Sequence, residues 1–259
     1  MIGAIIGDIA GSRFEFNNHR SKEFELFTDD CFVTDDSIMT LAVAKAIMEN
    51  AKTQQPLSSL AIRYMQEIGR KYPRCGYGAR FFRWVASNDP KPYGSYGNGA
   101  AMRVSPAGFA AGSEEDALLL AETVTAVTHD HPEGIKGAKA TALAIFIARQ
   151  GAGKNEIRDR MAGYYDLGFT INDIRGTYNY DITCQGTVPQ AIVAYLESGS
   201  FEDAIRTAVS LGGDSDTLAA ITGSIAEAYF GVPPEIKEKA LAYLDGELRG
   251  IYDEWVTVV

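Results

Sequence analysis

Apolar residues along most of this chain recur at intervals of three and four, the spacing of a helix with one buried face. Residues 37–50, for example, carry apolar residues at about this spacing, at Ile38, Leu41, Val43, Ala44 and Ile47. The same pattern predicts further helices over residues 56–70, 113–127, 132–150, 186–198, 202–210, 216–230 and 234–250. Alternation typical of strands is scarce, and only residues 23–33 and 254–259 suggest it. The sequence therefore predicts an all-α fold of many helices around one core.

The chain is 259 residues long, and no Pro-, Gly- or Ser-rich linker divides it. We therefore expect residues 1–259 to form one compact domain. Two stretches lack helical periodicity, a turn-rich one over residues 87–99 and a tyrosine-rich one over residues 163–185. Loops of such length usually cover or build a site.

Acidic residues outnumber basic ones, 34 Asp and Glu against 24 Lys and Arg, which gives a net charge of −10. This balance argues against general nucleic-acid binding and against an anionic membrane as partner. The apolar runs are too short to span a bilayer. Three scattered cysteines and an N-terminus without a basic region are typical of a cytoplasmic protein. Nothing in the sequence specifies an oligomeric state.

Two acidic boxes each precede an apolar helix, TDD at residues 34–36 and DSDT at residues 214–217. Each box alone fits ordinary helix capping, because Asp, Ser and Thr are preferred N-caps. Each nevertheless supplies more acids than a cap needs. If the two helix starts converge, four carboxylates would repel one another unless cations intervene. Oxygen ligands suit Mg²⁺, Mn²⁺ or Ca²⁺, and four acids are enough for two bridged metals.

The N-terminal segment carries glycines four residues apart, at Gly3, Gly7 and Gly11. On a helix they would make one smooth stripe, which favours close packing against a neighbouring backbone over contact with a ligand. Asp8 and Glu15 are seven residues apart and would share a helix face if the helix continued that far.

Residues 94–99 read GSYGNG, a stretch that could present backbone N–H groups to a phosphate while Tyr96 stacks on a base. An ordinary glycine-rich turn explains the composition equally well. The HDH triplet at residues 129–131 could bind a transition metal, but a polar helix entry capped by Asp130 is favoured.

Taken together, these motifs resemble the ADP-ribosylglycohydrolases. That family contains dinitrogenase-reductase-activating glycohydrolase and the ADP-ribosylarginine and ADP-ribosylserine hydrolases. The resemblance rests on GAIIGDIAGSRFEF, FVTDDSIMTLAVA, PYGSYGNGAAMRVSP, the Thr128-His129 pair and LGGDSDTLAAITGSIAEAYFG, in the family's order across residues 3–231. It implies an all-α bundle with two divalent metals, Mg²⁺ or Mn²⁺, in a central cleft.

The resemblance also implies roles for individual residues. The implied metal ligands are Thr34, Asp35, Asp36, Asp214, Asp216 and Thr217. Glu15 corresponds to an early acid on a mobile flap, and Asp35, Asp36 and Glu15 are the implied catalytic acids. The residues implied to hold ADP-ribose are Gly94, Ser95, Tyr96, Gly97, Asn98 and His129.

The implied activity is metal-dependent hydrolysis of the glycosidic bond between ADP-ribose and a modified acceptor, which would reverse ADP-ribosylation. The substrate would be an ADP-ribosylated protein or a small ADP-ribosyl conjugate. Three alternatives stay open: a non-catalytic ADP-ribose or nucleotide binder, a structural protein like the related jellyfish crystallins, and a two-metal phosphatase. The acceptor depends on loops near residues 71–88 and 163–185, and the ligand types suit Mg²⁺ and Mn²⁺ equally.

Overall fold

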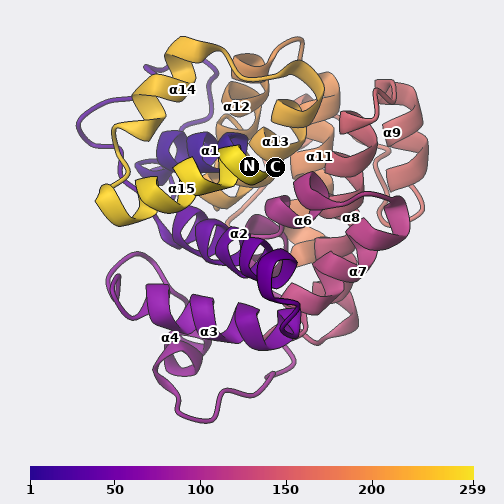
Figure 1. Ribbon diagram of the computed structural model, residues 1–259. Helices are drawn as coiled ribbons and strands as arrows, with labels where there is room; N and C mark the ends of the chain where they lie inside the picture. Colours follow the sequence, from indigo (N-terminus) through magenta and orange to yellow (C-terminus); the bar gives the residue numbers. More distant parts are fainter.

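The computed structural model describes residues 1–259 and consists of helices and loops, as the all-α expectation requires (Figure 1). The only β-type pairing is an isolated bridge between Gly97 and Thr183. The helices are α1 Ile2–Ser12, α2 Asp35–Thr53, α3 Leu57–Gly69, α4 Ala79–Ala86, α5 Gly99–Met102, α6 Ser105–Ala110, α7 Glu114–Thr125, α8 Pro132–Arg149, α9 Lys154–Met161, α10 Ile171–Ile174, α11 Cys184–Glu197, α12 Phe201–Val209, α13 Ser215–Phe230, α14 Pro234–Leu241 and α15 Gly246–Val258. No helix has the length and apolar character needed to cross a membrane.

Two expectations at the C-terminal end are wrong. The helix expected over residues 234–250 is broken, and α15 begins anew after Asp245, whose carboxylate accepts hydrogen bonds from the backbone N–H groups of Glu247 and Leu248. Residues 254–258 continue α15 instead of forming a strand, because Leu248, Ile251 and Trp255 bury one helical face. Residues 23–33 likewise form loops and turns, with no strand.

Helix α13 lies at the centre of the molecule and packs against α1, α8, α11 and α12 (Figure 1). Every residue from Ser215 to Ala226 is buried. A helix that is buried on all sides cannot carry the polar face of a surface helix. Its N-terminal residues therefore belong to the interior, and the second acidic box lies there.

The glycine stripe of α1 is a packing surface, as the sequence predicts. A Cβ atom on Gly7 would lie 2.0 Å from the carbonyl oxygen of Ala219, and one on Gly3 would lie 2.1 Å from that of Gly223. At the end of the stripe, a Cβ atom on Gly11 would lie 2.5 Å from the Cα atom of Asp216. Only glycine permits this approach, and it brings α1 against the helix that begins with the second acidic box.

Candidate metal centre and ligand cleft

The two acidic boxes converge in the structure. The hydroxyl of Thr217, at the start of α13, donates a hydrogen bond to the Asp36 carboxylate at the start of α2, over 3.2 Å. The Thr34 hydroxyl approaches the same oxygen of Asp36 at 3.5 Å. Both helices thus direct their positive ends at one cluster of acids, which lowers the electrostatic cost of bringing those acids together.

Capping explains only the first box. The Thr34 side chain accepts a hydrogen bond from the backbone N–H of Asp36 and caps α2. Asp214 occupies the N-cap position of α13, yet its side chain caps nothing. It instead accepts a hydrogen bond of 2.7 Å from the side-chain amide of Asn98. The Asp214 carboxylate therefore does not serve as a cap, whereas the Asp216 carboxylate accepts a hydrogen bond of 3.0 Å from the Thr217 N–H in the first turn.

Three carboxylates are close enough to hold one cation. Glu15, Asp214 and Asp216 each place a carboxylate oxygen within 4.8 Å of the other two. Beside them, one oxygen of the Asp36 carboxylate is buried and has no hydrogen-bond partner. An orphaned buried carboxylate oxygen is costly unless a ligand satisfies it. Hard oxygen donors in this arrangement fit a divalent cation such as Mg²⁺ or Mn²⁺.

Without a bound cation, burying these carboxylates close together costs free energy. Burial raises the pKa values of Asp36 and Asp216 well above their ordinary range, and neighbouring carboxylates raise them further. Burial and the charges of Asp8 and Asp214 raise the pKa of Asp35 to about 8. Burial is also the main cause that raises the pKa values of Glu15 and Asp214. A bound cation would remove this repulsion.

Asp8 is a residue whose role the sequence did not reveal. Its fully buried carboxylate accepts hydrogen bonds from the Thr34 hydroxyl at 2.7 Å, the Thr34 N–H at 3.1 Å, the Ser37 N–H at 3.0 Å and the Ser37 hydroxyl. Burial raises its pKa to about 6 in spite of these bonds. Asp8 therefore fixes the backbone of the first acidic box from α1.

Glu15 lies beyond the end of α1, which stops at Ser12, so Asp8 and Glu15 do not share one helix face. The Tyr180 hydroxyl donates a hydrogen bond of 2.9 Å to the Glu15 carboxylate. The Tyr180 ring also stacks on Phe16, with the ring centroids 6.0 Å apart. The tyrosine-rich segment 163–185 thus reaches the acidic cluster, as expected of a long loop near a site.

A cleft of about 390 Å³ opens over the acidic cluster. The expected site residues that line it are Glu15, Asp35, Asp36, Ser95, Gly97, Asn98, His129, Asp214, Asp216 and Thr217. Thr34 is buried beneath the cleft, where it contacts Asp8 and Asp36. Gly94 and Tyr96 lie outside its lining. The Tyr96 ring packs beside His131, with ring centroids 5.0 Å apart.

Hydrogen bonds connect the glycine-rich stretch to other segments around the cleft. The Asn98 backbone N–H donates to the carbonyl of Ile182 over 2.8 Å, and its side chain reaches Asp214 and Thr187. The Gly94 N–H donates to the Asp130 carboxylate over 2.6 Å. Asp130 therefore does not cap α8 as expected. His131 does so, by accepting from the Glu133 N–H.

His129 lies at the floor of the cleft as a neutral hydrogen-bond donor. The Arg103 guanidinium, which can only donate, lies 3.1 Å from its Nδ1 atom. Nδ1 must therefore be the acceptor, and Nε2 carries the proton. Burial and the positive charge of Arg103 hold the pKa of His129 well below its usual range. A Cβ atom on Gly99 would lie 3.4 Å from Nε2, so this nitrogen borders the glycine-rich stretch.

Arg103 and Arg80 supply positive charge to the cleft, and neither was predicted from the sequence to be a site residue. Arg103 is 1% exposed and forms no ion pair; it contacts the Thr128 hydroxyl and the face of Phe81. Arg80 lies over the Tyr93 ring at 4.8 Å. The only available signal for Arg103 was its place four residues after the GNG tripeptide. A cleft lined by both acids and arginines suits a ligand that carries both hydroxyls and phosphates.

The fold is all-α, and its two acidic boxes converge under a glycine-rich cleft wall. Comparison of the sequence with protein families identifies a class of protein with this site. The family model described as ADP-ribosylglycohydrolase matches residues 1–257, so the chain belongs to that family.

Characterised relatives carry consistent names. The "ADP-ribosylhydrolase ARH3" of Xenopus tropicalis is 27% identical, with 95% of this chain and 91% of the relative covered. The human protein of the same name is 26% identical, with 90% of this chain and 84% of the relative covered. The "ADP-ribosylarginine hydrolase Tri1" of Pseudomonas putida is 28% identical, with 92% and 72% covered.

The fold is also that of a solved structure called "ADP-ribosylglycohydrolase-related protein complex". The two superpose with a TM-score of 0.70, with 99% of this chain and 96% of that chain covered. Their sequences are 24% identical, so the likeness concerns the fold alone.

Proposed function

We propose that this protein is a metal-dependent hydrolase that releases ADP-ribose from a modified acceptor by cleaving the glycosidic bond. The observation that carries the proposal is the convergence of the two acidic boxes, joined by the Thr217–Asp36 hydrogen bond, beneath the glycine-rich wall of a cleft. Family membership and the names of the relatives support the same activity. Residues 1–259 act as one domain in this proposal.

Two divalent ions, Mg²⁺ or Mn²⁺, would be held by the oxygen atoms of the two boxes. The proposed ligands are Thr34, Asp35, Asp36, Asp214, Asp216 and Thr217. When bound, such ions lower the pKa of water toward neutrality and bind ribose hydroxyls. The unpartnered Asp36 oxygen and the close approach of Glu15, Asp214 and Asp216 support this assignment.

The protein residues would then position the substrate and move its protons. The distal ribose lies over the acids, with its anomeric carbon close to Asp35 and Asp36. One of these two carboxylates orients the attacking water and accepts its proton. The dense negative charge stabilises the oxocarbenium-like transition state of glycosidic cleavage. Glu15, held by Tyr180 at the rim, shields the reaction and assists proton transfer.

The rest of the ligand would lie along the glycine-rich wall. The neutral His129 donates from Nε2 to the ligand. The loop of residues Gly94 to Asn98 lies along the diphosphate and adenosine, with Ser95, Gly97 and Asn98 facing the cleft. Arg103, buried without an acidic partner, balances the phosphate charge from below. A binder without turnover is the alternative, but such a protein would not need the repelling carboxylates that burial makes costly here.

A panel of ADP-ribosyl conjugates tests the proposal. Arginine-, serine- and nucleobase-linked ADP-ribose are incubated with the protein in Mg²⁺, in Mn²⁺ and in chelator, and free ADP-ribose is measured. We expect chelator-sensitive release from at least one conjugate, which also names the acceptor. Saturable binding of ADP-ribose without release from any conjugate would favour the binding protein.

A further inference from the structure

The segment that forms one wall of the cleft carries a charge opposite to that of the whole protein. Residues 70–93 contain six Lys or Arg and one Asp, whereas the chain as a whole has 24 basic and 34 acidic residues. The basic residues are Arg70, Lys71, Arg74, Arg80, Arg83 and Lys91. A concentrated positive field on an acidic protein attracts anions to that place.

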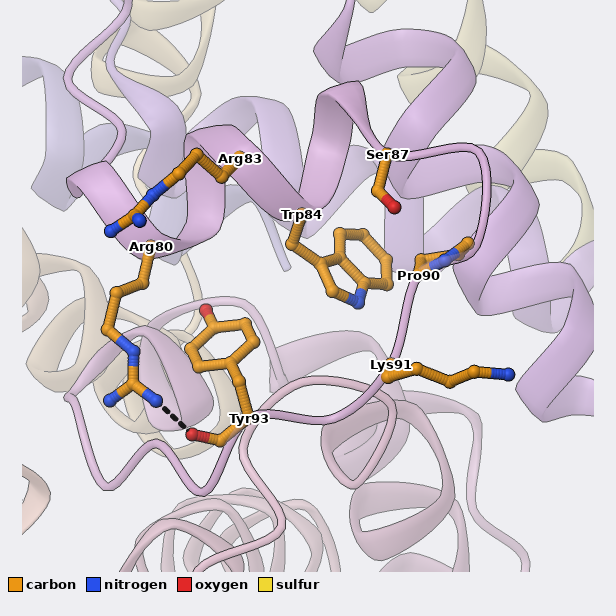
Figure 2. Close-up of a pocket in the computed structure, with 7 residues that line it drawn as sticks. All are labelled: Arg80, Arg83, Trp84, Ser87, Pro90, Lys91 and Tyr93. Atoms are coloured by element: carbon orange, nitrogen blue, oxygen red, sulfur yellow. Dashed lines mark hydrogen bonds between the residues drawn. The ribbon is translucent and has the colours of Figure 1, made fainter.

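A second cavity, of about 270 Å³, lies in this segment between α4 and the loop that follows it. Its lining consists of Arg80, Arg83, Trp84, Ser87, Pro90, Lys91 and Tyr93 (Figure 2). Figure 2 shows the Trp84 indole between Tyr93 and Pro90, with Arg80 and Lys91 on opposite sides. Two aromatic walls with cations around them suit a phosphorylated ligand better than an apolar one.

The cations of this cavity have no strong partners within the chain. Arg80 and Arg83 form no ion pair, and their hydrogen bonds go to the backbone carbonyls of Tyr93 and Ala79. Lys91 pairs with Asp89, but both side chains are more than 70% exposed, so that solvent screens the pair. The charge of the two guanidinium groups is therefore available to a ligand.

A buried donor in the wall also lacks a partner. Trp84 is 4% exposed, and its indole N–H makes no hydrogen bond. A buried N–H group without an acceptor costs free energy unless a ligand or water supplies one. The guanidinium groups match the acceptor oxygens of a phosphoryl group, and a ligand oxygen that reached the indole N–H would supply its missing acceptor.

The cavity adjoins the cleft, because Arg80 and Tyr93 line both. We propose that this cavity is a phosphoryl-binding subsite, which takes a phosphate group beyond the diphosphate of the ligand in the cleft. The inference rests on the proposed function for the identity of that ligand. The phosphate belongs to the cleft ligand itself, as in ADP-ribose with a 2′-phosphate on its adenosine ribose, or to a separate phosphorylated molecule.

Nuclear magnetic resonance can test the subsite, since the chain has only two indole N–H groups, those of Trp84 and Trp255. Inorganic phosphate is titrated at constant ionic strength, with sodium chloride as the compensating salt. We expect a saturable shift of the Trp84 signal and none of the Trp255 signal. Arg83→Gln should weaken phosphate binding at least fivefold. The matched control, Arg63→Gln on the exposed face of α3, should leave it unchanged.

Titrations with two ADP-ribose ligands, each on the wild type and on Arg83→Gln, separate the sources of the phosphate. ADP-ribose with a 2′-phosphate should bind at least fivefold more tightly than ADP-ribose, and Arg83→Gln should abolish the difference. A Trp84 shift with inorganic phosphate but no gain from the 2′-phosphate would support the subsite and assign it to a separate molecule. The absence of a saturable shift, or equal weakening by Arg63→Gln, would overturn the subsite.

The proposed function can fail independently of this test. Arg83 lies outside the cleft, so Arg83→Gln should release ADP-ribose from unphosphorylated conjugates at the wild-type rate. If the wild-type protein releases none, the proposed function fails while the phosphate titration still reports on the cavity.

Discussion

Thr217 and Asp36 are 181 residues apart in sequence and are joined by a hydrogen bond of 3.2 Å. This contact places the starts of α2 and α13 at one point. The four aspartates of the boxes and Glu15 then lie close together. Only bound cations or protons can relieve the repulsion between their carboxylates.

Asp8→Asn should destabilise the protein and weaken metal binding. The Asp8 carboxylate accepts bonds only from donors on Thr34 and Ser37, and an amide would place its own N–H₂ group against one of them. A buried mismatch of this kind costs about 1–3 kcal/mol. Urea unfolding measures the stability, and calorimetric titration with Mn²⁺ measures the affinity. Asp29→Asn, in the exposed loop before the first box, is the control. If Asp8→Asn and Asp29→Asn had the same unfolding free energy and the same Mn²⁺ affinity, Asp8 would not hold the backbone of the first acidic box in place.

Gly7→Ala should separate α1 from α13. The added Cβ atom would lie 2.0 Å from the Ala219 carbonyl oxygen, and backbone atoms cannot yield as a side chain does. Overpacking in a tight core costs about 1–3 kcal/mol, and we expect the thermal midpoint to fall accordingly. Gly112→Ala, where an added Cβ atom meets nothing within 4 Å, should change the midpoint little. A stable Gly7→Ala variant would refute the close helix contact.

The metal-free protein should become less stable as the pH rises. The folded pKa of Asp8 is about 6 and that of Asp35 about 8, both above the ordinary carboxyl value of 3.8. Between about pH 4 and pH 8 the folded state therefore binds more protons than the unfolded state, and stability falls with increasing pH. Thermal unfolding in chelator from pH 5 to pH 8 measures this slope. Added Mn²⁺ should restore most of the loss at pH 8. A slope of the opposite sign would contradict the raised pKa values.

His129 should remain neutral through pH 6, with its proton on Nε2. Arg103 donates to Nδ1, and burial with two nearby arginines lowers the pKa of the imidazole. Long-range ¹⁵N–¹H spectra distinguish the two tautomers, and His129→Gln assigns the signal among three histidines. Protonation of His129 with a midpoint near 6.5 would be inconsistent with this environment.

The sequence revealed the two acidic boxes but not the residues that hold them in place. The acidic boxes were visible because several acids stand together before apolar helices. Their convergence was not, since the Thr217–Asp36 contact depends on how α1 and α13 pack. Asp8 and Arg103 were missed for the same reason: each is a single polar residue in an apolar stretch, and only its tertiary neighbours give it a role. The break before α15 did have a local signal, Asp245 followed by Gly246, a frequent turn pair.

Asp216→Asn tests the central claim most directly. Asp216 is buried beside Glu15 and Asp214, and the substitution removes one charge at nearly constant volume. We expect this variant to lose bound metal and nearly all release of ADP-ribose. Its thermal midpoint in chelator should equal or exceed that of the wild type, because one repelling charge is gone. Asp159→Asn, on the exposed face of α9, should behave as the wild type in all three measurements. Full activity of Asp216→Asn with unchanged metal content would contradict the account of the site.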